Sequence, residues 1–320
     1  TLGRPSERFD RPLQRIIGAI PLTLGQSKVL QSVSLHRDLA GLAHFFIFWG
    51  FLSFILSYLI FIFGDSVWSD FSKTILTETG VRAFTIYIDI LAVFFLAILL
   101  WAALRRWVIK PSRLRFDLTQ STDAAIILVL IASLMALTLL TEGLYVASGG
   151  QGPETEAPVG LALGHLFGNL GIDEDMATSL HSLFWWTHLT IILGFAIYIP
   201  MSKHMHLIAS PLSFLLRSLE PMGALQTPRD LETAEIFGAG KLQEFSFKEL
   251  LDGYSCAVCG RCTDSCPAHI SGKTLSPMHI VESLKEQLVD KGPGLLDGYD
   301  HQDSSPMIGP LIGEESLWDF

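Results

Sequence analysis

The stretch GLAHFFIFWGFLSFILSYLIFIFG, from Gly41 to Gly64, contains no Asp, Glu, Lys or Arg. The hydrocarbon core of a bilayer is about 30 Å thick, so an α-helix needs about 20 apolar residues to cross it. This stretch is long enough, and so are three further apolar runs. The sequence therefore predicts four membrane-spanning helices, over residues 41–64 and approximately over 83–104, 123–147 and 179–201.

The composition of the whole chain agrees with a membrane protein. Of the 320 residues, 49% are hydrophobic and 17% are charged, whereas a soluble domain carries about 25% charged residues. The mean hydropathy is +0.41. This composition excludes a disordered or collagen-like chain, and the net charge of −10 argues against nucleic acid as a partner.

The distribution of Lys and Arg predicts the orientation in the bilayer. Six of them precede the first span and five lie at positions 105–115, between the second and third spans, whereas residues 149–178 contain none. We therefore expect both ends of the chain on the cytoplasmic side of the inner (cytoplasmic) cell membrane. Because the first residue is Thr1, we also expect an N-terminus that is missing or processed.

Changes in composition divide the chain into four parts. We predict a basic cytoplasmic juxtamembrane segment at 1–40, which meets lipid headgroups, and a transmembrane bundle at 41–210. A linker rich in Pro and Gly follows at 211–245, and a small module at 246–320. In the module, helices are expected over 247–254 and 279–291, with turns over 292–310. The predicted fold class is an all-α membrane helix bundle followed by a ferredoxin-like α-helical module.

The motif YSCAVCGRCTDSCP, at residues 254–267, contains all the cysteines of the chain. Their spacing is C-x2-C-x2-C-x3-C-P, the bacterial ferredoxin pattern for a [4Fe–4S] cluster. Zinc sites normally use two separated pairs of ligands, and thiol redox chemistry needs only two cysteines in a thioredoxin-like context. The sequence therefore predicts an iron–sulfur site in a reducing compartment, with the ligands Cys256, Cys259, Cys262 and Cys266.

The last cysteine of the motif leaves two possibilities open. In ferredoxins with two clusters, the fourth cysteine binds the other cluster. If Cys266 does so, this chain supplies only three ligands to the first cluster, and no further cysteine follows. We therefore expect the native protein to continue beyond residue 320 with a second motif.

Histidines in or near the spans are candidate haem ligands, because ionisable groups within a membrane are energetically costly and mark functional sites. A b-type haem takes imidazoles from two facing helices. His44 and His206 lie at matching cytoplasmic depth, and we predict them as an axial pair. His188 lies 18 residues before His206, so on a continuous helix the two share a face about 27 Å apart. This separation suits iron sites on opposite sides of a bilayer.

His188 has no histidine opposite it at the outer depth, where the first span offers Phe54 and other apolar residues. His181 lies on the same face two turns away, so these two cannot bracket one iron, and His165 would have to fold back from a loop. Three interpretations remain open: His188 binds a second haem with such a partner, binds a five-coordinate haem, or donates a hydrogen bond to a quinone. His36, His165, His181 and His204 are interpreted as packing residues in preference to ligands.

Two carboxylates also fall within the predicted spans, Asp89 in the second and Glu142 in the third. Either can exchange a proton with a quinone, or can make a polar contact between helices. Both interpretations remain open for both residues.

Two resemblances follow from these motifs. The stretch WWTHLTIILGFAIYIPMSKHMHLIASP, from Trp185 to Pro211, resembles the cytochrome b (gamma) subunit of respiratory nitrate reductase, in which two histidines of this helix bind two different haems. The motifs RFDRPLQRIIGAI, GLAHFFIFWGF, IPMSKHMH and CAVCGRCTDSCP, in this order, resemble membrane-bound iron–sulfur oxidoreductases related to heterodisulfide reductase. Among these, the likeness is to electron-transfer-flavoprotein:menaquinone oxidoreductases of bacterial fatty-acid oxidation.

These resemblances imply a function and a longer protein. The function is electron transfer from a reduced soluble electron-transfer flavoprotein, through one or two [4Fe–4S] clusters and one or two b haems, to menaquinone as substrate. The longer protein has a fifth membrane helix before this chain, and a second ferredoxin motif with Cys-rich domains after it. LIGEESLWDF, at 311–320, resembles the approach to that motif. His44 matches a haem-ligand position, whereas Phe54 falls near the other, where this sequence departs from the pattern.

Two alternative functions remain open at the level of sequence. The first is a thiol–disulfide reductase of the heterodisulfide or sulfite-reduction type, whose catalytic site would lie in the Cys-rich domains. The second is a non-enzymatic membrane anchor for a soluble redox partner. The anchor predicts that replacing His44 or His206 by Ala leaves membrane electron transfer intact.

Overall fold

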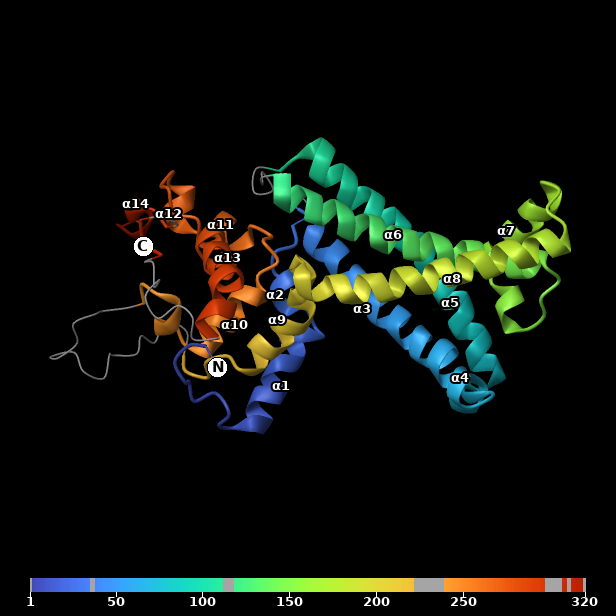
Figure 1. Cartoon of the computed structure of the whole chain (residues 1–320), viewed down its shortest axis with the longest axis horizontal. Helices are drawn as coiled ribbons and strands as arrows, with labels where there is room; N and C mark the ends of the chain where they lie inside the picture. The colour runs from blue at the N-terminus through green and yellow to red at the C-terminus, as the bar shows by residue number, and fades with distance from the viewer. Residues whose placement is uncertain are drawn as a thin grey trace. The chain divides into compact units, whose positions relative to one another are not determined.

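The computed structural model describes residues 2–34, 38–111, 118–221, 239–296, 307–309 and 312–318 (Figure 1). Every regular element in these residues is a helix, as predicted. The chain forms two compact units. We call Val29–Pro111 with Arg115–Tyr198 the membrane unit, and Thr1–Lys28, Ser112–Leu114 and Ile199–Phe320 the cysteine unit.

The prediction of four membrane spans is confirmed. Four helical stretches in the described residues are long and apolar enough to cross a bilayer, and they run over Ala40–Val67, Phe71–Ile109, Ser121–Ala147 and Glu174–Met201. The elements of the membrane unit are α3 (Ala40–Ser57), η1 (Tyr58–Gly64), α4 (Asp65–Val67), α5 (Phe71–Leu104), η2 (Arg105–Ile109), α6 (Leu118–Ala147), η4 (Pro153–Glu156), α7 (Pro158–Asn169) and α8 (Glu174–Tyr198).

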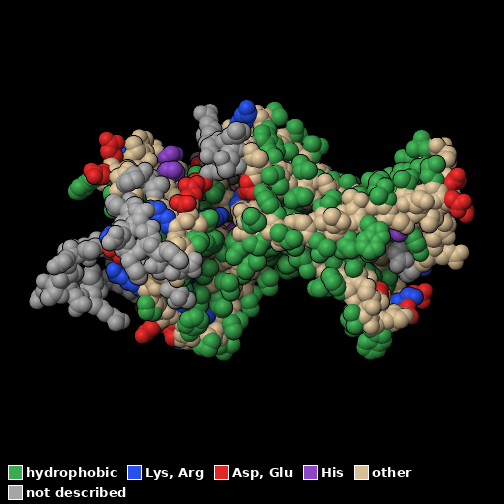
Figure 2. All heavy atoms as spheres, viewed as in Figure 1, with side chains coloured by type: hydrophobic (Ala, Val, Ile, Leu, Met, Phe, Trp, Pro, Cys, Tyr) green, Lys and Arg blue, Asp and Glu red, His purple; other side chains and the backbone are tan. Residues whose placement is uncertain are grey.

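Apolar side chains cover the outside of the membrane unit as well as its core. Figure 2 shows hydrophobic side chains over α3 and α6 on the face in view. Examples on other helices include Leu100 and Leu183, which are more than half exposed. Contiguous exposed apolar surface of this kind requires a lipid or protein neighbour, which agrees with the predicted bilayer.

The helices of the membrane unit pack closely where small residues allow it. Gly50 of α3 lies directly against the ring of Phe95 of α5, so a Cβ atom at this position would clash with that ring. Phe95 itself is only 1% exposed. Helix α6 packs against α5, α7 and α8 and is the central element of the unit.

Helix α7 was not predicted, because the sequence between the third and fourth spans was interpreted as a loop. Pro158 occupies the first turn of this helix, a position where a missing N–H does no harm. The carboxylate of Asp89, on α5, accepts hydrogen bonds from the backbone N–H groups of Val159 and Gly160 at 2.7 and 3.2 Å. Asp89 is fully buried. It therefore caps the N-terminus of α7 and holds α7 against α5.

The fourth predicted helix is confirmed as far as Tyr198, but the prediction that it continues unbroken to His206 is wrong. After α8 the chain makes two 3-10 turns, η5 (Ile199–Met201) and η6 (Lys203–Met205), separated by an extended Ser202. Pro200 explains the break, because proline has no N–H for the helical hydrogen bond and its ring clashes with the preceding turn.

The cysteine unit is a small helical domain. Its elements are α1 (Pro12–Thr23), η5, η6, α9 (His206–Leu215), η7 (Leu242–Glu244), α10 (Phe247–Ser255), α11 (Arg261–Asp264), α12 (Pro267–Ile270), α13 (Pro277–Leu296) and α14 (Glu314–Trp318), while α2 (Ser27–Leu30) joins the two units in sequence. The core of this unit consists of Leu242, Leu250, Leu284, Leu288, Met307 and Ile312.

The predicted helix over 247–254 is confirmed by α10, and a capping box of Ser246 and Glu249 begins it. The second predicted helix is also present, but α13 extends to Leu296 and so includes residues that were expected to form turns. The remainder of the predicted turn region, at 297–306 and 310, lies outside the described residues, as do residues 222–238 of the predicted linker.

The N-terminal segment belongs to the cysteine unit. Arg4 exchanges backbone hydrogen bonds with Phe245 and Phe247 at 2.7 and 3.1 Å. The expectation that the basic stretch meets lipid is wrong for Arg15, which is buried. Its guanidinium donates to the Asp10 carboxylate at 2.5 Å and to the Arg217 carbonyl at 2.6 Å.

Replacing Asp89 by Ala should destabilise the membrane unit by about 1–3 kcal/mol, because two buried N–H groups lose their acceptor. The thermal midpoint of the protein in detergent, followed by tryptophan fluorescence, should fall clearly. The control is Glu78→Gln, an exposed carboxylate on the same helix. Equal midpoints for Asp89→Ala and this control would contradict the capping role.

Candidate functional site

The cysteine motif forms a tight loop between α10 and α12. Cys256 follows the last residue of α10, and Cys266 immediately precedes α12. Two residues of the loop, Val258 and Gly260, adopt left-handed backbone conformations with φ of 51° and 75°. Gly260 tolerates this conformation because glycine has no Cβ atom. For a β-branched residue such as Val258 it is strained, and strain of this kind clusters at functional sites.

The four cysteines are free thiols, and N–H groups donate to the sulfur atoms of Cys256 and Cys259. The backbone N–H of Val258 donates to Cys256 Sγ at 3.4 Å, and Arg261 Nε–H donates to Cys259 Sγ at 3.2 Å. Burial raises the pKa of the Cys256 thiol, whereas the Val258 hydrogen bond acts against this rise. N–H donors around sulfur stabilise thiolate charge and are one of the means by which proteins tune iron–sulfur clusters.

The cysteine loop carries the sulfur donor atoms that an iron–sulfur cluster requires. Within the residues that the structure describes, no three His, Cys, Asp or Glu side chains are close enough together to hold one metal ion. A [4Fe–4S] cube does not need such convergence, because each thiolate bonds a different iron. The spacing of the thiols, the loop conformation and the N–H···S contacts are therefore compatible with Cys256, Cys259, Cys262 and Cys266 as cluster ligands, which remains a prediction.

A buried polar network joins α9 to α10 within the cysteine unit. Lys248 is only 8% exposed, and its Nζ donates to Asp252 Oδ1 at 2.5 Å and to Ser213 Oγ at 3.2 Å. Ser213 Oγ–H donates to the same carboxylate oxygen at 2.5 Å. At the other end of the contact, Ser210 Oγ–H donates to the Ser255 carbonyl at 3.3 Å. These contacts fix α9 beside the helix that leads into the cysteine loop.

His206 is the first residue of α9. Its Nδ1–H donates to the Lys203 carbonyl at 2.6 Å, so the proton lies on Nδ1 and the lone pair on Nε2, the arrangement used in many metal-bound imidazoles. Burial lowers the pKa of His206, and the positive charges of Lys285, Lys203 and Arg261 lower it further, against the effect of the Lys203 hydrogen bond. The imidazole is therefore neutral at pH 7, the form that binds iron.

The packing of α9 against α10 relates His206 to the cysteine loop. His206 begins α9, and α9 contacts α10, whose last residue precedes Cys256. The predicted haem ligand and the predicted cluster ligands therefore lie on contacting elements of one folded unit. His44 lies on α3 in the membrane unit and is half-buried. Its pairing with His206 remains a prediction from the sequence.

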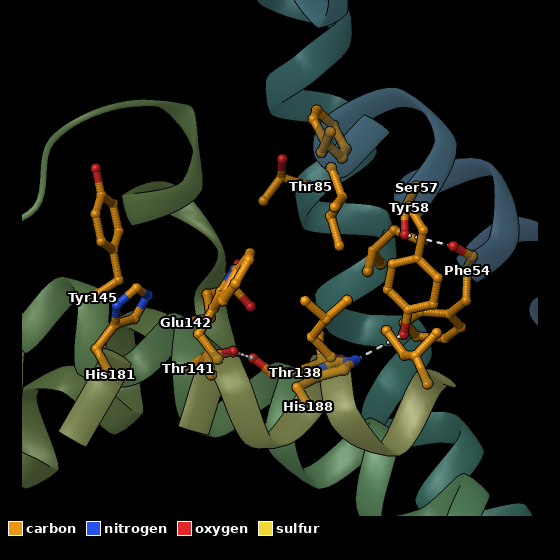
Figure 3. Close-up of a pocket in the computed structure, with 16 residues that line it drawn as sticks. Phe54, Ser57, Tyr58, Thr85, Thr138, Thr141, Glu142, Tyr145, His181 and His188 are labelled. Carbon is orange, nitrogen blue, oxygen red and sulfur yellow. Dashed lines mark hydrogen bonds between the residues drawn. The ribbon is translucent and has the colours of Figure 1, made fainter. Parts of the chain in front are cut away.

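A cavity of about 370 Å³ lies inside the membrane unit, between α3 with η1, α5, α6 and α8 (Figure 3). It contains three of the residues singled out in the sequence, His181, His188 and Glu142. Phe54, the residue of the first span that was expected at the depth of His188, also lines the cavity. The remaining lining residues are Ser57, Tyr58, Phe61, Ile62, Thr85, Ile88, Thr138, Thr141, Tyr145, Trp185, Leu189 and Ile192.

Sequence analysis missed Tyr58, which is the direct partner of His188. Tyr58 Oη and His188 Nε2 are 2.9 Å apart and hydrogen-bonded, and the two rings are perpendicular (Figure 3). Tyr58 begins the π-helix η1, and short π-helical segments in α-helices occur frequently at functional sites. The available signal was the position of Tyr58, one turn after Phe54.

Other predicted residues lie elsewhere. Asp89 caps α7 and does not line the cavity. His165 is on the exposed side of α7, so it does not fold back toward His188. His204 lies beside His206, with ring centroids 5.6 Å apart. His36 lies outside the described residues.

The chain is similar to two longer oxidoreductases. It is 32% identical over 288 residues to the probable iron-sulfur-binding oxidoreductase FadF of Bacillus subtilis (strain 168), an alignment that covers 89% of this chain and 39% of FadF. It is 30% identical over 341 aligned residues to the EtfAB:quinone oxidoreductase of Syntrophomonas wolfei subsp. wolfei, which covers 98% of this chain and 46% of that protein. The chain thus spans less than half the length of these curated relatives.

A shorter similarity concerns a third protein. Over 88 residues, 27% of this chain and 12% of the relative, the chain is 33% identical to a probable membrane-anchored ferredoxin of Chromohalobacter salexigens. No protein-family model matches the chain. No solved structure matches it either.

Replacing Arg261 by Gln should lower the reduction potential of the cluster, because the reduced cluster loses a charged donor to Cys259 Sγ. A charge-assisted hydrogen bond contributes about 1.5–3 kcal/mol, which for a one-electron couple corresponds to a decrease of about 60–130 mV. Redox titration followed by electron paramagnetic resonance of the full-length protein measures this change.

The matched control is Lys285→Gln, which removes a nearby positive charge on α13 for which no contact with a cysteine sulfur is observed. It should change the potential less than Arg261→Gln does. A potential that is unchanged in Arg261→Gln, with full iron content, would show that the Arg261 contact does not tune a cluster.

Proposed function

We propose that this chain is part of a membrane-bound iron–sulfur oxidoreductase that passes electrons from a reduced electron-transfer flavoprotein, through [4Fe–4S] and haem b, to menaquinone. Four apolar spans support the membrane location. The cysteine motif and the similarity to proteins named as an iron-sulfur-binding oxidoreductase and an EtfAB:quinone oxidoreductase support the redox chemistry. The cysteine unit is proposed to face the cytoplasm, in line with the distribution of Lys and Arg.

The observation that supports this proposal most directly is the packing of α9 against α10. Ser210, one turn after His206 on α9, donates to the carbonyl of Ser255, the residue before Cys256, so His206 and the cysteine loop belong to helices in direct contact. When bound, an iron–sulfur cluster and a haem each accept and donate one electron at a time. Electron transfer between two such centres requires a short distance between them. The packing of α9 against α10 is proposed to maintain that distance.

The residues of the chain have separable tasks in this proposal. The four cysteines hold the cluster, and Val258 and Arg261 donate to their sulfur atoms. His206 is oriented by its Nδ1–H bond to the Lys203 carbonyl, and we propose His44 as the second axial ligand. The buried contact of Lys248, Asp252 and Ser213 holds the two groups of ligands together.

The proposal predicts a b-type haem spectrum that depends on His206 and His44. In membranes that contain the full-length protein, reduced flavoprotein should produce the absorbance of reduced haem b, and a menaquinone analogue should abolish it. His206→Ala and His44→Ala should each lose this absorbance by at least ten-fold, because a bis-histidine haem loses an axial ligand. Pyridine haemochrome and iron analysis per chain measure both cofactors.

The control is His165→Ala, an exposed histidine on α7, which should keep the full haem signal. Unchanged haem content in His44→Ala and His206→Ala would contradict the assignment of the ligands. Haem reduction by a dithiol and not by the flavoprotein would favour the thiol–disulfide reductase instead.

A further inference from the structure

The polar groups of the cavity in the membrane unit gather at two ends. Figure 3 shows the Tyr58–His188 pair at one end, and Glu142, His181 and Tyr145 at the other. Most of the lining between them is apolar or aromatic. The volume of about 370 Å³ lies in the range of small-molecule sites, about 300–1,000 Å³, which also combine an apolar lining with a few polar groups.

The geometry at His188 does not suit a haem held between His188 and the residue that faces it. Two axial ligands on opposite sides of a metal have donor atoms about 4 Å apart, because each metal–ligand bond is about 2 Å long. Tyr58 Oη and His188 Nε2 are only 2.9 Å apart and share a hydrogen bond. The neighbouring position on α3 is Phe54, which is 3% exposed and has no donor atom.

We infer that this cavity binds the ring of a lipid-soluble quinone, with the Tyr58–His188 pair at one carbonyl oxygen and Glu142 with His181 at the other. This inference rests on the proposed function, which supplies the quinone as substrate class. A quinone ring is flat and apolar, and its two carbonyl oxygens stand at opposite ends. The cavity has the same distribution of polarity, and it lies between helices long enough to span the membrane.

The arrangement also provides for the protons of quinone reduction. The ring takes up two electrons, which the reduced flavoprotein supplies through the redox centres of the chain, and each carbonyl oxygen takes up one proton to give the quinol. Tyr58 O–H or His188 N–H donates to one oxygen. The side chains of Glu142 and His181, at the other end, are both of a kind that binds and releases protons.

The test measures binding of heptyl-hydroxyquinoline N-oxide, a fluorescent quinone analogue whose emission decreases on binding, to the full-length protein in nanodiscs. Tyr58→Phe and His188→Gln should each weaken binding about ten-fold, because the first removes a hydroxyl from the ring site and the second replaces the imidazole by an amide that does not reproduce its position. The double variant should weaken binding by less than the product of the two effects, because the two groups act as one hydrogen-bonded pair.

Two matched controls exist on the same unit. Tyr87→Phe removes a hydroxyl from α5 that bonds to Ser53 outside the cavity, and His165→Gln removes an exposed imidazole from α7. Both should bind the analogue as the unaltered protein does. The thermal midpoint and the iron–sulfur content per chain show whether each variant is folded. If His188→Gln does not accumulate, Tyr58→Phe alone tests the inference.

Equal affinity for the analogue in Tyr58→Phe, His188→Gln and the controls would overturn the inference. So would loss of one haem per chain in His188→Gln, since the cavity would then be a haem site. The binding measurement needs no electron donor. If the analogue binds with the predicted dependence and flavoprotein fails to reduce the protein, the cavity assignment stands and the proposed electron donor is wrong.

Discussion

The contact between α9 and α10 is the constraint on which the proposed electron path depends. Lys248, at the centre of this contact, is buried, and it bonds to the Asp252 carboxylate and the Ser213 hydroxyl. Removing the carboxylate would leave the buried ammonium without its opposite charge, which costs free energy. The contact therefore holds α9 beside α10, and with it the proposed haem ligand at the start of α9 beside the proposed cluster ligands just after α10.

The membrane unit meets a different constraint, since in lipid each buried polar group must find its partner within the protein. Asp89 satisfies it through the N-terminus of α7, and Tyr58 and His188 satisfy it through each other. The two cases differ in consequence. Both carboxylate oxygens of Asp89 accept hydrogen bonds from backbone N–H groups, and Asp89 does not line the cavity. The Tyr58–His188 hydrogen bond borders the cavity, which a ligand with its own acceptor is able to enter.

The sequence alone predicted the features that depend on length and local spacing. Runs of about 20 apolar residues located all four spans, and the helix before the cysteine motif was also predicted. Features that depend on tertiary contacts were missed. The partnership of Tyr58 and His188 joins residues 130 positions apart, and the cap on α7 joins residues 70 positions apart. The helix break at Pro200 was overlooked because the spacing of His188 and His206 was measured along an unbroken helix.

The break between α8 and α9 has a consequence for how the protein is assembled. Because two 3-10 turns interrupt the helix, His206 takes its orientation from the cysteine unit and not from the fourth span. α10 leads into the loop that carries the proposed cluster ligands, and α10 packs against α9. Under the proposed function, we therefore expect haem acquisition to depend on the folded cysteine unit, so that a chain whose cysteine loop is disrupted inserts in the bilayer without a haem spectrum.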